Sequence, residues 1–101
     1  MKNIITINGV SFELQNNVIR LPLVERYPHR TIWDCYDRPS AKKVAIYEEW
    51  LRYANSIDAQ GFTVSSYNCN FFSLTFEFRY NGVKYHANIT YAHNYLYEIE
   101  E

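Results

Sequence analysis

The chain has 101 residues, of which 48% are apolar, 18% aromatic and 21% charged, with a formal net charge of −1. This length fits one domain over residues 1–101, and the apolar content is typical of a globular protein with a buried core. The balanced charge gives no electrostatic reason to expect nucleic acid or an anionic membrane as partner. The N-terminus carries no apolar leader-like stretch and no run reaches the length of a membrane span, so we expect a cytoplasmic protein.

The first predicted element is a β-hairpin around Asn8-Gly9. Asparagine and glycine tolerate the positive φ angles that both central residues of a type I′ turn need. A short strand follows at 18–21, and Pro22 favours an edge position for it because proline donates no ladder hydrogen bond. One face of the hairpin is apolar and consists of Ile5, Ile7, Val10 and Phe12.

Residues 23–39 show neither helical nor strand periodicity. Loops of this length are uncommon in compact domains and are often functional. This one is rich in aromatic and cationic side chains, which are over-represented among interface hot spots. The predicted partner-binding residues are Tyr27, Arg30, Trp33, Tyr36 and Arg38 from this loop, with Tyr95 and Tyr97 from the C-terminal segment.

An amphipathic helix is predicted over residues 41–57. Ser40 can act as its N-cap, because the serine hydroxyl oxygen accepts a backbone N–H of the first turn. Apolar side chains occupy one half of the helical wheel, and we expect Trp50 and Leu51 near the middle to be its main contacts with a sheet. A strand candidate follows at 62–65.

Residues 71–91 carry the clearest pattern, a second hairpin around Asn81-Gly82. Its two-residue loop fixes the register by counting outward, so that Glu77 lies opposite His86. Alternating apolar positions, Phe76 and Phe78 among them, share the face that packs on the helix. The polar positions share the other face, which we expect to meet water or a partner: Ser73, Thr75, Glu77, Arg79, Lys84, His86, Asn88 and Thr90.

The C-terminal segment 92–101 keeps some alternation and is interpreted as a weak strand or an extended tail. An apolar helical face and an apolar sheet face must cover each other. The predicted fold is therefore α+β, a two-layer sandwich in which an antiparallel sheet of 4–6 strands packs against one helix.

Candidate chemistry centres on His86 and Glu77. A carboxylate opposite a histidine would favour and orient an imidazolium, as a small hydrolase or metal enzyme would require. However, such a pair on an exposed sheet is more often structural, and the spacing of His86, His93 and Cys69 matches no compact ligand pattern. The chain also lacks phosphate-binding glycine motifs. We therefore expect no enzyme activity, no cofactor and no metal.

Nucleic acid is the alternative partner. An exposed polar face can contact phosphates, although here the aromatic side chains that would stack on bases point to the helix. The residues that would carry such binding are Glu77, Arg79, Lys84, His86 and Asn88.

Four parts of the chain carry a likeness to known proteins: Asp34-Cys35-Tyr36-Asp37-Arg38-Pro39-Ser40, Trp50, Asn68-Cys69-Asn70-Phe71-Phe72 and Tyr91-Ala92-His93-Asn94-Tyr95. They resemble small uncharacterised proteins of phages and other mobile elements of low-GC bacteria. The resemblance implies a short cytosolic protein from a group that includes inhibitors of host defence, such as anti-CRISPR proteins. Many of those inhibitors are strongly acidic, so the net charge of −1 favours blocking by shape over DNA mimicry.

These observations lead to a functional hypothesis of a non-enzymatic protein-binding module that modulates a host protein such as a defence nuclease. The alternatives are a nucleic-acid-associated accessory protein that uses the polar face and a small hydrolase or metal enzyme around His86 and Glu77. A homodimer through an open sheet edge is a further expectation, because an unpaired strand is a template for association.

Overall fold

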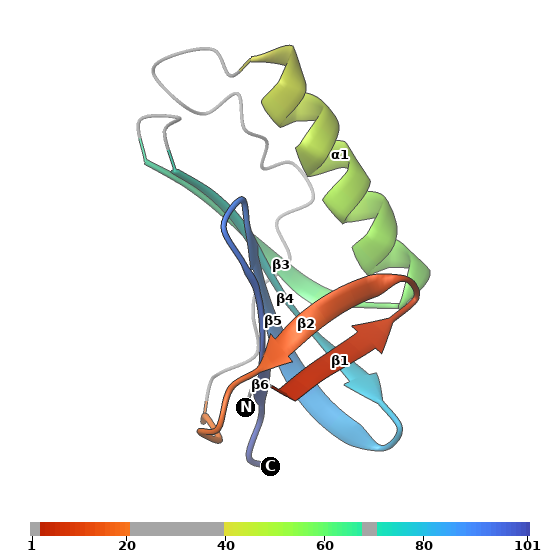
Figure 1. Cartoon of the computed structure of the whole chain (residues 1–101). Coiled ribbons are helices and arrows are strands. Elements are labelled where there is room, and N and C mark those ends of the chain that lie inside the picture. The colour runs from red at the N-terminus through yellow and green to blue at the C-terminus, as the bar shows by residue number, and fades with distance from the viewer. Residues whose placement is uncertain (1–2, 21–39, 68–70) are drawn as a thin grey trace.

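The computed structural model describes residues 3–20, 40–67 and 71–101, in which one helix packs on one face of a six-stranded sheet (Figure 1). The strand order is β1-β2-β6-β5-β4-β3. The predicted α+β fold is confirmed. The elements are β1 (Asn3–Ile7), β2 (Val10–Leu14), α1 (Ala41–Ser56), β3 (Gln60–Tyr67), β4 (Phe71–Tyr80), β5 (Val83–Thr90) and β6 (Asn94–Glu98).

Both Asn-Gly hairpins are confirmed. Asn8 and Gly9 have φ angles of 48° and 84°, and Asn81 and Gly82 have 50° and 82°, as type I′ turns require. The β4–β5 register follows the predicted pairing throughout, including Glu77 opposite His86. A two-residue turn fixes the register of the two strands that it joins, so the turn determines which side chains share a face.

The helix begins where Ser40 predicts, with the backbone N–H of Lys43 donating to the Ser40 hydroxyl oxygen at 3.3 Å. Trp50 and Leu51 near its middle pack against the core, as predicted. Trp50 and Leu51 are half-buried, whereas Ala54 is fully buried. The small side chain of Ala54 is thus completely covered, whereas the large indole of Trp50 keeps part of its surface exposed.

The C-terminal segment, expected as a weak strand or an extended tail, forms the strand β6, which lies inside the sheet. It pairs antiparallel with β5 and parallel with β2, which makes the sheet mixed. Leu96 has no exposed surface. The predicted strand at 18–21 is present only as a bridge between Ile19 and Ile99 in the described residues.

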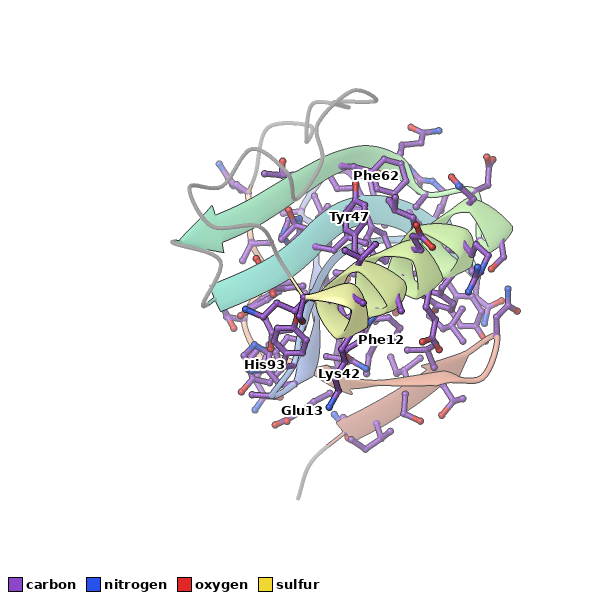
Figure 2. The ribbon with its side chains drawn as sticks, turned by 90° about the horizontal axis from the view of Figure 1, so that it is seen from above. Phe12, Glu13, Lys42, Tyr47, Phe62 and His93 are labelled. Atoms are coloured by element: carbon purple, nitrogen blue, oxygen red, sulfur yellow. The ribbon has the colours of Figure 1, made fainter. Side chains whose placement is uncertain are left out.

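The core lies between α1 and the sheet face that it covers. Figure 2 shows Phe12 beneath the helix, with Tyr47 and Phe62 projecting into the space between α1 and the strands β3 and β4. We call this side of the sheet the helix face. The fully buried side chains on it are Phe12, Leu74, Phe76, Ala87 and Leu96.

Candidate functional site

The opposite side of the sheet, the polar face, is buried at its centre, and the prediction that it meets water or a partner is wrong there. Glu77 is 1% exposed and His86 9%. The Lys84 ammonium lies 3.9 Å from a Glu77 carboxylate oxygen, and the His86 ring packs on Tyr97 with ring centroids 6.2 Å apart. The alternation of polar and apolar residues shows which side chains share a face. It does not show whether other side chains cover that face. Ser73 and Thr90 are buried on this face as well.

Electrostatics at His86 also differs from the expectation of a stabilised imidazolium. Burial lowers the pKa of His86, which favours the neutral ring. Its Nδ1 has no hydrogen-bond partner among the described residues, and the side-chain oxygen of Asn88 has none either. An acid–base histidine needs an oriented ring. The contacts of the described residues give no such orientation through Nδ1.

The two cations predicted for nucleic-acid contact are engaged with acidic side chains of the same chain. Arg79 pairs with the Glu101 carboxylate and donates to the Gly82 carbonyl oxygen at 3.2 Å. Lys84 lies beside Glu77. Charges that are neutralised within the chain offer little to a phosphate backbone.

The described part of the chain contains no group of three or more His, Cys, Asp and Glu side chains that could hold a metal ion. His93 stacks on Tyr95 with ring centroids 3.8 Å apart. The predicted partner-binding tyrosines Tyr95 and Tyr97 lie on the polar face, opposite Asn88 and His86 respectively. The loop residues Tyr27, Arg30, Trp33, Tyr36 and Arg38 lie outside the described residues.

A different, concave site lies where the pairing between β2 and β6 ends. These strands pair only at Glu13 with Tyr95 and Leu14 with Leu96, so they separate toward the start of β2. The Asn94 side-chain amide spans this separation and donates to the Ser11 carbonyl oxygen at 3.3 Å. The result is a cavity of about 210 Å³, here called the seam groove. It is lined by Val10, Glu49, Trp50, Tyr53, Ile89 and Asn94.

Tyr53 is held in place at the groove by several contacts. Its hydroxyl donates to the Ile7 carbonyl oxygen at 2.9 Å, and its ring packs against Phe12 and Phe76 with centroids 6.1 and 6.5 Å apart. Desolvation of the partly buried phenol raises the pKa of Tyr53 to about 12. The phenol therefore stays neutral at physiological pH, and this wall of the groove is pre-formed.

Beside the groove, the ring of Trp50 contacts the ring of Tyr91. The two rings lie 5.8 Å apart at a tilted angle, and Tyr91 is 46% exposed. Thr90 fixes the turn that carries Tyr91, because its hydroxyl oxygen accepts the backbone N–H groups of Ala92 and His93 at 3.2 and 3.1 Å. An aromatic pair with one exposed member thus stands beside the cavity.

The seam groove combines apolar lining residues with a negative charge. Val10 and Ile89 are aliphatic, Trp50 and Tyr53 are aromatic, and Glu49 is the only charged residue among the described residues that line it. Sequence reasoning placed Trp50 in the core and missed the groove. The signal was weak, because the groove depends on where two strands distant in the sequence stop pairing.

Comparison of the chain with protein-family models, with curated proteins and with solved structures finds no match. Within the described ranges, no helix has both the length and the apolar character needed to cross a bilayer.

Proposed function

We propose that this chain is a non-enzymatic protein-binding module that holds a partner at the seam groove. The observation that carries the proposal is the groove itself, an apolar cavity walled by Trp50 and a fixed Tyr53 and bordered by the exposed Tyr91. Aromatic side chains that ring a small apolar pocket are typical of the anchor points of protein interfaces.

The chemistry of the lining describes the partner. A cavity of about 210 Å³ suits one apolar side chain rather than a whole ligand. Glu49 at its border favours a basic neighbour beside that anchor, and none of the described residues that line the groove is a cation. The expected partner surface is therefore an apolar residue flanked by lysine or arginine.

A basic partner surface agrees with the hypothesis of a host defence nuclease, because proteins that bind nucleic acid carry clusters of lysine and arginine. In this proposal the chain is encoded by a phage or mobile element and blocks such a protein by occupying its surface. A net charge of −1 is too small for mimicry of DNA along a whole groove.

The test is affinity capture of the host partner from a nuclease-treated lysate, followed by titration with the purified proteins. Tyr91→Ala and Glu49→Arg should each weaken binding about tenfold or more, the loss expected at an interface hot spot. The control is Glu48→Arg, which makes the same charge change on an adjacent exposed residue that does not line the groove.

Equal affinity for the wild type and both groove variants would refute the groove as the binding site. Capture that disappears on nuclease treatment would instead support the alternative, in which nucleic acid bridges the chain to its partner.

A further inference from the structure

We propose that β1 is a self-pairing edge through which two copies of the chain join their sheets. Within the described residues β1 pairs with β2 alone, so among these residues its other side is an open edge. Sheet edges are commonly protected by charged side chains, proline or bulges. The sequence of β1, Asn3–Ile7, contains none of these.

The hairpin turn determines which backbone groups point outward. Ile7 and Val10 flank a two-residue loop and form a hydrogen-bonded pair, and such pairs alternate with non-hydrogen-bonded ones along an antiparallel ladder. Thr6 and Ser11 are thus a non-hydrogen-bonded pair, whose side chains lie close; their hydroxyl oxygens are 2.9 Å apart. The N–H and C=O groups of Ile4 and Thr6 therefore face the open edge.

This pattern selects one register for an antiparallel pair of identical strands. Placing Ile4 opposite Thr6 of the second copy, and Thr6 opposite its Ile4, uses all four outward groups of each strand. Ile5 then lies on the two-fold axis opposite itself, in a non-hydrogen-bonded pair with Cα atoms about 4.5 Å apart. Ile5 lies on the helix face opposite Phe12 and is half-buried, so the contact covers its remaining exposed surface.

A second copy suits this edge better than a charged partner strand. The strand carries no charge, and a net charge of −1 per chain gives little repulsion between copies. Ile4, which is 55% exposed, gains cover from the second strand. By contrast, β3 at the other border of the sheet is irregular between Gln60 and Phe62. Pairing along a five-residue strand buries little surface area compared with stable interfaces, so the association is concentration-dependent.

The experiment is light scattering on the full chain at low and high concentration. The average molar mass of the wild type should rise from that of a monomer to that of a dimer as the concentration increases. Ile4→Pro removes one outward donor without touching a bond to β2, and should abolish the doubling, whereas Ile4→Val should retain it. Circular dichroism verifies that each variant is folded.

The register has its own test in a chain with Cys35→Ser and Cys69→Ser. Ile5→Cys should form a disulfide-linked dimer on mild oxidation, because a Cα separation of about 4.5 Å lies within disulfide range. A wild type that stays monomeric at every concentration would overturn the proposal, as would dimers that persist in Ile4→Pro. A disulfide through Ile4→Cys instead of Ile5→Cys would overturn the register. None of these outcomes depends on the seam groove.

Discussion

Replacing Leu96 by alanine tests whether β6 is an interior strand. Leu96 has no exposed surface and lies between Ala87 of β5 and Leu14 of β2. The change removes three buried carbons, which at about 0.8 kcal/mol each contribute about 2.4 kcal/mol of transfer free energy. The cavity left behind adds to this, so we expect a loss of about 3–4 kcal/mol, within the range of core leucines.

Urea unfolding followed by circular dichroism measures this loss. The midpoint should fall while the slope with urea stays unchanged, and the Tm should drop by at least about 10 °C for a domain of this size. Glu98→Ala, an exposed position on the same strand, serves as the control. A loss below about 1 kcal/mol for Leu96→Ala would mean that the segment is a tail and would refute the sheet order.

Two further predictions concern the hairpin β4–β5. Burial lowers the pKa of His86 below its ordinary 6.5 in the fold, so the unfolded chain takes up a proton more readily. The free energy of unfolding should thus be highest above pH 6.5 and should decrease below that pH by up to about 1.4 kcal/mol per pH unit. His86→Gln should reduce this slope. Identical slopes in the wild type and the variant would contradict the burial of His86. At Gly82, φ is 82° and a Cβ would meet nothing within 4 Å, so strain alone should cost Gly82→Ala about 1–2 kcal/mol. Gly82→Asn should cost less in the same melts, and equal stability of all three proteins would argue against the type I′ turn.

The sequence was informative wherever structure is set locally. Each Asn-Gly pair determined a turn, and the turn determined a register; Ser40 determined the start of the helix. By contrast, the parallel contact of β2 with β6 joins segments about 80 residues apart and has no local signature. Leu96 stands between Tyr95 and Tyr97, so the alternation predicted a strand without showing which face is buried.

The candidate sites were less predictable for the same physical reason. Polarity suggested an exposed face around Glu77, but burial depends on what covers a side chain, which the alternation does not encode. The seam groove lies where the pairing of two strands distant in the sequence ends, which no local pattern encodes. Trp50 was recognisable as important from its type and position, yet only the fold places its ring beside Tyr91.

The central claim is that the seam groove holds the partner. The most direct measurement is a ¹⁵N NMR titration of the labelled chain with the purified host protein captured by it. Backbone amide signals of Val10, Glu49, Ile89 and Asn94, and the side-chain amide signal of Asn94, should shift or broaden first, while the backbone signals of His86 and Asn88 on the polar face stay in place. Shifts confined to the polar face, with the groove signals unchanged at saturation, would contradict the account.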